Sequence, residues 1–133
     1  MMPATRQRIA MSMYAMVDCM ALRPTPEVSM ELNKHLGIMA GALDYLQPVP
    51  IAKRTDPVSS ALVMALGVMI AVEKRHDEGQ GLALTEDEAA ILRRSSGKFD
   101  DALRMIPYNV YEASRIFVEG AMKNLVTEQA GSL

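Results

Sequence analysis

Few residues of this chain could do chemistry, and the clearest pattern among them is a Glu-x-x-His pair. Glu73 and His76 have the spacing with which di-iron helical bundles place two ligands on one helix face. Such a site needs a second pair and two further glutamates, and the other histidine, His35, has a glutamate four positions before it but none at three. We therefore predict no metal site and no cofactor.

Nucleophilic catalysis finds no support in the sequence either. The single cysteine, Cys19, has no histidine near it and cannot form a disulfide within the chain, so we expect a buried, inert thiol. No Gly-x-Ser-x-Gly elbow occurs, and Ser95-Ser-Gly-Lys98 lacks the upstream glycine and the preceding strand of a phosphate-binding loop. These absences predict a protein that is not an enzyme.

Nucleic-acid binding is a second class of function for which the sequence contains some signals. The net charge of −2 gives no overall attraction to phosphates, and the one small basic group consists of Arg93, Arg94 and Lys98. Residues 84–92, Leu-Thr-Glu-Asp-Glu-Ala-Ala-Ile-Leu, resemble the first helix of the LuxR-type helix-turn-helix, which would imply DNA binding. The resemblance ends there, because Phe99-Asp-Asp-Ala102 replaces the recognition helix. A helical nucleic-acid-binding regulator is therefore the alternative interpretation.

The elements that carry these residues are all predicted to be helices. Proline and capping residues divide the chain into five segments, and no strand-like alternation occurs. Pro57 follows the N-cap candidate Asp56, and Thr85 with Glu88 forms a capping box. We predict helices over residues 4–22, 26–46, 57–77, 86–106 and 110–127, with frayed residues 1–3 and 128–133. Gly97 leaves open a break in the fourth helix.

The third helix differs from the others, because residues 61–72 contain no polar side chain. A helix that is apolar all round must be enclosed on every side. The segment is short for a membrane span, which needs about twenty mainly apolar residues, and charged residues border it at both ends. We therefore expect no membrane contact and predict one all-α domain over residues 1–133. Its fold is a five-helix antiparallel bundle around a central apolar helix, residues 57–77.

Broad apolar faces on the surrounding helices predict self-association, most simply as a homodimer. The second helix carries a heptad-like seam, and the first a stripe of methionines, which pack adaptably. The candidate interface residues are Met13, Met16, Met20, Leu32, Leu36, Met39, Leu43 and Leu46. Gly37 and Gly41 have the GxxxG spacing, which we interpret as helix packing. On the inner face of the fifth helix we place Val110, Phe117, Ala121 and Leu125.

These observations predict a non-enzymatic helical module for protein–protein interaction, such as an adaptor, a chaperone-like binder or a regulator. They do not identify its protein partner. A helical bundle that binds a small apolar ligand is a further alternative. The arginine-containing start of the chain is not followed by a clear cleavage site, so the sequence predicts no signal peptide and the expected location is the cytoplasm.

Overall fold

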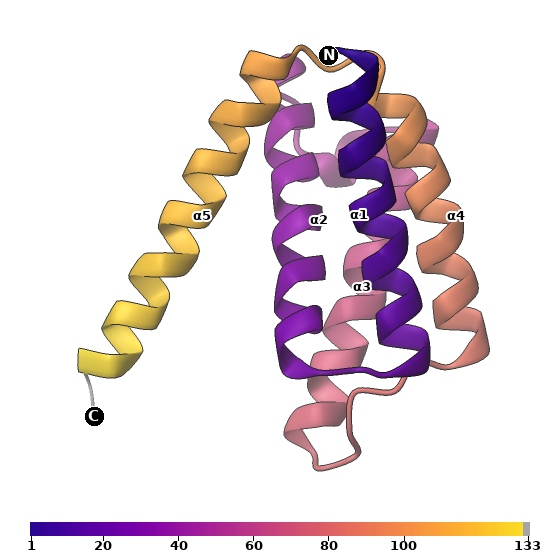
Figure 1. The fold of residues 1–133 in the computed structure, drawn as a ribbon, viewed down its shortest axis with the longest axis vertical. Coiled ribbons are helices and arrows are strands. Elements are labelled where there is room, and N and C mark those ends of the chain that lie inside the picture. The colour runs from indigo at the N-terminus through magenta and orange to yellow at the C-terminus, as the bar shows by residue number, and fades with distance from the viewer. Residues whose placement is uncertain (132–133) are drawn as a thin grey trace.

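A computed structural model shows the chain to be all-α, as predicted (Figure 1). It describes the backbone of residues 1–131 and the side chains of residues 1–51 and 53–124. In chain order the helices are α1 (Pro3–Leu22), α2 (Pro26–Leu46), the short 3-10 helix η1 (Ile51–Lys53), α3 (Pro57–Asp77), α4 (Glu86–Leu103) and α5 (Tyr108–Gly131). Successive α-helices run in opposite directions, so the predicted antiparallel bundle of five helices is confirmed.

Side-chain caps begin α3 and α4 where the sequence predicts them. The Asp56 carboxylate accepts a hydrogen bond of 2.9 Å from the backbone N–H of Ser59, with Pro57 in the first turn. Thr85 and Glu88 form the reciprocal capping box. The Thr85 hydroxyl accepts from the Glu88 N–H at 3.1 Å, and the Glu88 carboxylate accepts from the Thr85 N–H at 2.9 Å.

The fourth helix, α4, runs unbroken through Gly97 and ends at Leu103, shortly before the predicted end. Two buried serines precede that glycine, and both hydroxyls find backbone acceptors. Ser95 donates to the carbonyl oxygen of Ala61 on α3 at 3.2 Å, and Ser96 donates to the carbonyl four residues earlier at 2.8 Å. Because these polar groups are satisfied, they are tolerated at the interface between α4 and its neighbours.

The connection from α2 to α3 is held in place by Arg54. Its guanidinium is almost fully buried and donates to the carbonyl oxygens of Val49 at 2.9 Å and Leu43 at 3.1 Å, and also to that of Gln47. These bonds join the last turn of α2 to the residues that follow it, and the Leu43 carbonyl also accepts the helix-ending bond of 3.0 Å from the Gln47 N–H. One arginine therefore fixes where α3 begins relative to α2.

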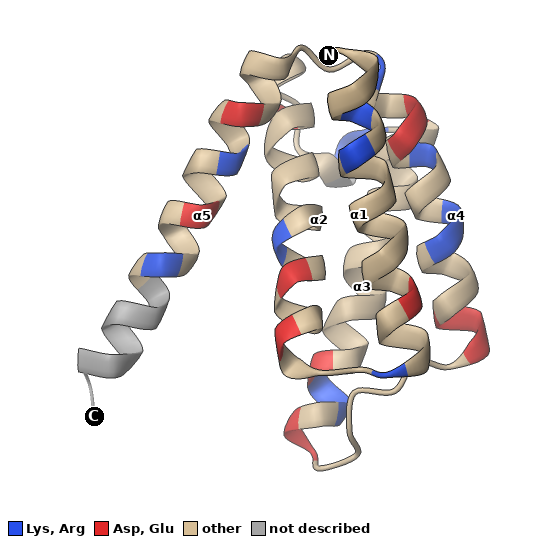
Figure 2. Ribbon diagram, in the orientation of Figure 1, with Lys and Arg blue, Asp and Glu red and all other residues tan. Residues whose placement is uncertain are grey.

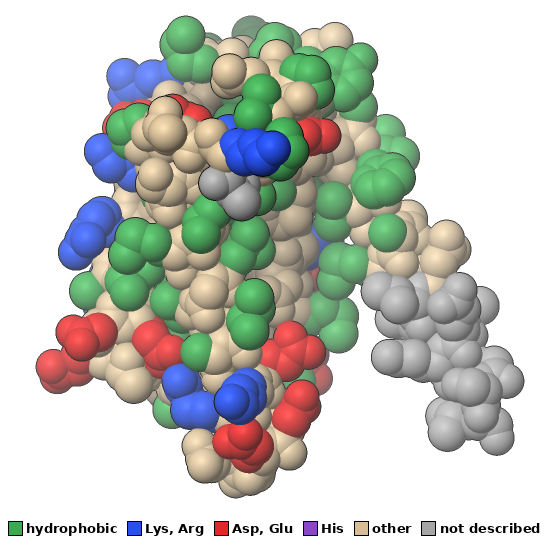
Figure 3. Space-filling model, turned by 180° about the vertical axis from the view of Figure 1, so that it is seen from behind, with side chains coloured by type: hydrophobic (Ala, Val, Ile, Leu, Met, Phe, Trp, Pro, Cys, Tyr) green, Lys and Arg blue, Asp and Glu red, His purple; other side chains and the backbone are tan. Residues whose placement is uncertain are grey.

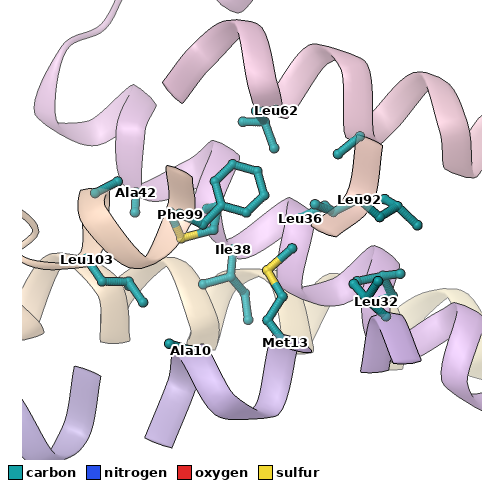
Figure 4. Packing of buried hydrophobic residues seen from close by; sticks show 14 of the residues in the cluster. Ala10, Met13, Leu32, Leu36, Ile38, Ala42, Leu62, Leu92, Phe99 and Leu103 are labelled. Atoms are coloured by element: carbon teal, nitrogen blue, oxygen red, sulfur yellow. The ribbon is translucent and has the colours of Figure 1, made fainter. Parts of the chain in front are cut away.

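The hydrophobic core lies between α1, α2, α3 and α4 (Figure 4). Phe99 of α4 is 1 % exposed and packs among aliphatic side chains from the other helices. The largest fully buried side chains are those of Phe99, Met20, Leu32, Leu36, Ile38, Leu62, Met69, Leu92, Leu103, Ile106, Val17 and Val72.

The prediction that the helix at 57–77 stands at the centre is wrong. α3 packs mainly on α2 and α4, and its far side faces solvent. The helix with neighbours on several sides is α2, which packs on α1, α3 and α5. An apolar run of twelve residues does not by itself show that every side is enclosed, since only one face of α3 contributes to the core.

The last helix, α5, packs chiefly on α2 and is inclined to the other helices (Figure 1). Its contact runs along the GxxxG spacing, with Ser114 against Gly41 and Val118 against Gly37. Val110 is buried as predicted. Phe117 and Ala121 are exposed, which corrects their predicted placement, and Leu125 lies outside the described side chains. α5 continues to Gly131, beyond its predicted end.

Candidate protein-interaction surface

The outer face of α3 is an exposed apolar strip. Val63, Met64 and Ile70 are 46 %, 48 % and 68 % exposed, and Gly67 between them is also exposed. We call these four residues the α3 strip. On the opposite side of the same helix Leu62, Ala65 and Met69 are buried. Exposed apolar side chains gathered on one helix face are typical of a binding surface rather than of scattered surface residues.

A groove between α3 and α4 adjoins the α3 strip. Its volume is about 240 Å³, and it lies beside Ala61 and Met64 of α3 and Ile91 of α4. Arg94 and Lys98 border it, and both are exposed. The groove is therefore apolar within and positively charged along its α4 side. A pocket of this size holds apolar side chains of a docked helix more readily than a whole drug-sized ligand, which needs at least about 300 Å³.

Figures 2 and 3 show how charge borders this face. Hydrophobic side chains gather over the middle of the surface in Figure 3, with basic side chains toward one end of an edge and acidic side chains toward the other. Along α4 the acidic residues Glu86 and Asp87 stand in the first turn, and Arg94 and Lys98 follow two to three turns later. The face thus has an apolar middle with both signs of charge at its margin.

Most of the residues predicted to form an interface on α1 and α2 pack inside the bundle instead. Its residues fall into three groups: the buried Met13, Met20, Leu32, Leu36 and Met39, the partly buried Met16 and Leu43, and the exposed Leu46. The five buried side chains cannot reach a partner unless the bundle opens. The heptad-like spacing on α2 therefore describes its packing inside the bundle, and an interface has to be sought elsewhere.

The predicted basic group is split between two surfaces. Arg93 lies toward α1, where its guanidinium approaches the Asp18 carboxylate to 3.7 Å. Arg94 and Lys98 border the groove instead. Each surface also carries carboxylates close by, which gives no continuous basic track along which a phosphate backbone could lie.

The residues with possible chemistry do not come together. Within the described part of the chain no three His, Cys, Asp or Glu side chains are placed to hold a metal ion. Glu73 and His76 are exposed near the end of α3. Cys19 is exposed, which corrects the expectation of a buried thiol. His35 is partly buried on α2, and this burial, assisted by the charge of Lys34, lowers the pKa of its imidazole.

A second exposed apolar face lies on α5. Ile116 and Phe117 are 60 % and 77 % exposed. Elsewhere on this helix Arg115 pairs with Glu112 and Glu119, and Glu119 also approaches Lys34 of α2 at 3.5 Å. The groove between α3 and α4 adjoins the α3 strip rather than this face, so this face is the smaller candidate.

Among the described residues, α3 is the one helix long and apolar enough to cross a membrane. Core helices of soluble proteins meet the same criteria of length and composition. Of the residues in the most apolar window of α3, 33 % are buried, and the exposed ones include the four residues of the α3 strip. No protein-family model, curated protein or solved structure matches this chain.

Proposed function

We propose that this chain is a non-enzymatic helical module for protein–protein interaction that binds its partner through the α3 strip and the adjoining groove. The observation that carries this proposal is the exposure of Val63, Met64 and Ile70 on a helix whose other face builds the core. Leaving such a strip in water is unfavourable, since apolar surface contributes about 25 cal/mol for each Å² that is removed from water. A protein that covers the strip gains this contribution.

The chemistry of the surface indicates what kind of partner fits. An apolar helix can lie along the α3 strip and place side chains in the groove. Arg94 and Lys98 at the groove's border favour acidic side chains at the flank of that helix. Met64 lines both the strip and the groove, and methionine adapts its shape to different neighbours.

The alternative functions are less well supported by the same surface. A nucleic-acid regulator would present Arg94 and Lys98 beside polar groups, whereas here they border apolar side chains and stand on the same helix as Asp87. A steep loss of duplex DNA binding with added salt would favour that function. A small apolar ligand would have to fit the open groove of about 240 Å³.

A pair of methionine variants tests the proposal in the native host. Met64→Glu places a charge on the α3 strip, whereas Met105→Glu places the same charge at an exposed site between α4 and α5. Tagged copies are purified beside an untagged copy of the chain, and the retained proteins are compared by quantitative mass spectrometry. We expect at least one retained protein, either another protein or the untagged copy, to be lost with Met64→Glu and kept with Met105→Glu. Identical sets for both variants and the unaltered chain would contradict the proposal.

A further inference from the structure

We propose that the partner on the α3 strip is a second copy of this chain, docked as an antiparallel two-fold dimer in which α3 packs on α3. This inference rests on the proposed function, because it names the partner of the same surface. Its basis is the spacing of the exposed residues on α3 together with the complementary charges that a two-fold axis brings together.

The exposed face of α3 has the spacing of a helix–helix seam. Its positions repeat at three, four, three and four residues, and all are exposed: Ser60, Val63, Gly67, Ile70 and Lys74. This is the spacing of the a and d positions in a coiled coil, where each side chain enters a space between residues of the facing helix. The predicted seam on α2 faces the core through Leu32, Leu36 and Met39, whereas the seam on α3 faces solvent.

When two α3 helices pack antiparallel with the two-fold axis at the level of Ala65, small residues of one helix face large residues of the other. Val63 then faces Gly67 of the second copy, and Ser60 faces Ile70 of the second copy. By symmetry each pairing occurs twice, so two bulky side chains on each helix meet small residues. Gly67 has open space where a Cβ would stand, which leaves room for a neighbouring side chain to approach its backbone.

Charges at the ends of the seam agree with this arrangement. The same centre places Asp56, which precedes α3, opposite Lys74 of the second copy. Both residues are exposed. Opposite charges therefore meet at each end of the apolar seam, where they favour one alignment of the two helices over its shifted alternatives.

Contacts between α3 and α4 determine which residues of α4 flank the seam. Ser95 is joined to the carbonyl of Ala61 at 3.2 Å, and Arg75 to Glu88 by hydrogen bonds of 3.0 and 2.5 Å. These bonds fix α4 antiparallel to α3, and they place the level of Ala65 close to the middle of α4. In α4 the stripe at four, three and four residues consists of Asp87, Ile91, Arg94 and Lys98.

A two-fold axis at this level brings Lys98 opposite Asp87 of the second copy, since the two contacts put Ala65 level with Arg93, five residues before Lys98 and six residues after Asp87. The pairing is made twice, once on each copy. A parallel pair of α3 helices would instead bring Lys98 toward Lys98 and Asp87 toward Asp87. The charge pattern of α4 therefore favours the antiparallel dimer.

Charge reversal on the full chain tests this arrangement. Lys98→Glu and Asp87→Lys each make both flank contacts repulsive in their own homodimer, so we expect each to weaken dimerisation roughly tenfold. In an equal mixture both contacts become attractive, and the dimer should return. Light scattering during size exclusion measures the mass of each sample against the 14.6 kDa of one chain. Circular dichroism checks that every variant is helical.

Matched controls separate this interface from general effects of charge. Glu86→Lys makes the same change one residue earlier, but Glu86 lines a recess on the α1 side of α4, so this variant should still dimerise. Ile70→Glu should give a monomer because it places a charge in the seam. It keeps the test decisive if Asp87→Lys does not fold, since Ile70 is 68 % exposed and its replacement leaves the core intact.

Several results would overturn the inference. One is a chain that stays monomeric at tens of micromolar, and another is a dimer that tolerates both Ile70→Glu and Lys98→Glu. A mixture of the two charge variants that fails to recover the dimer would overturn the antiparallel arrangement. A monomer that sediments with vesicles containing anionic lipid would assign the strip to a membrane surface. If the chain is monomeric but Met64→Glu still loses another host protein, this inference fails while the proposed function stands.

Discussion

The Ser114 hydroxyl of α5 occupies the space that a Cβ on Gly41 of α2 would fill, and it donates a hydrogen bond of 2.7 Å to the carbonyl oxygen of Ile38. A Gly41→Ala substitution would force that hydroxyl away and break the bond. We expect a loss of about 1–3 kcal/mol in the free energy of unfolding, measured in urea, despite the better helix propensity of alanine.

Gly37→Ala is the matched control for this prediction. A Cβ there would meet Val118 at 3.6 Å, which is an ordinary van der Waals contact. The variant should be as stable as the original or more stable by up to about 1 kcal/mol, because alanine favours a helix interior. Equal losses for both variants would show that the approach of α5 to α2 is not closest at Gly41.

The two phenylalanines should respond in opposite ways to substitution. Phe99 is 1 % exposed, so Phe99→Ala should cost about 3–5 kcal/mol of unfolding free energy through lost burial and a cavity. Phe117 is 77 % exposed, so Phe117→Ser should change stability by less than about 0.5 kcal/mol. Chemical denaturation of both variants measures the difference. A large loss for Phe117→Ser would mean that the side chain packs inward, as its spacing predicts.

Stability should fall on mild acidification because of His35. Burial, with the charge of Lys34, holds the pKa of this imidazole below its ordinary value of 6.5. Above that value the side chain is neutral in both the folded and the unfolded chain, so its ionisation does not change the free energy of unfolding. As the pH falls through 6.5, the unfolded chain takes up a proton that the folded chain resists, so the free energy of unfolding decreases. The decrease levels off once the pH is below the lowered pKa.

Melting temperatures between pH 7.5 and 5.5 check this dependence. Gln cannot be protonated, so His35→Gln should flatten the decline. His76→Gln is the matched control, since His76 is exposed at the end of α3, and it should follow the unaltered chain. The same slope for His35→Gln and the unaltered chain would rule out His35 as the group responsible.

The helix boundaries could be predicted because their signals are local. Asp56 and the Thr85–Glu88 pair act on backbone groups within one turn, so neighbouring residues determine the outcome. The position at which a helix ends depends less on neighbouring residues in the sequence. Tertiary contacts decide that α4 runs through Gly97, where the hydroxyl of Ser95 reaches α3.

The side of α3 that faces the core could not be predicted from the sequence, because it depends on which other helices pack against α3. Twelve apolar residues in α3 carry no polar face to mark the side toward solvent, so Ile70 and Met69 look equivalent in the sequence. On α5, Phe117 would face inward if α5 packed on several helices. It packs chiefly on α2, which buries a narrower face containing Val110 and Ser114.

Adjacent residues of α3 provide the sharpest check on which side of this helix is covered. Met69 is 2 % exposed within the core, so Met69→Asp buries a charge without a partner and should abolish folding. Ile70 is 68 % exposed, so Ile70→Asp should keep the helical circular dichroism spectrum and cooperative unfolding of the monomer. An enclosed α3 would make both variants unfold, whereas a helix with one free face distinguishes them. If Ile70→Asp unfolds the chain as Met69→Asp does, the outer face of α3 is covered within the monomer and cannot serve as a docking surface.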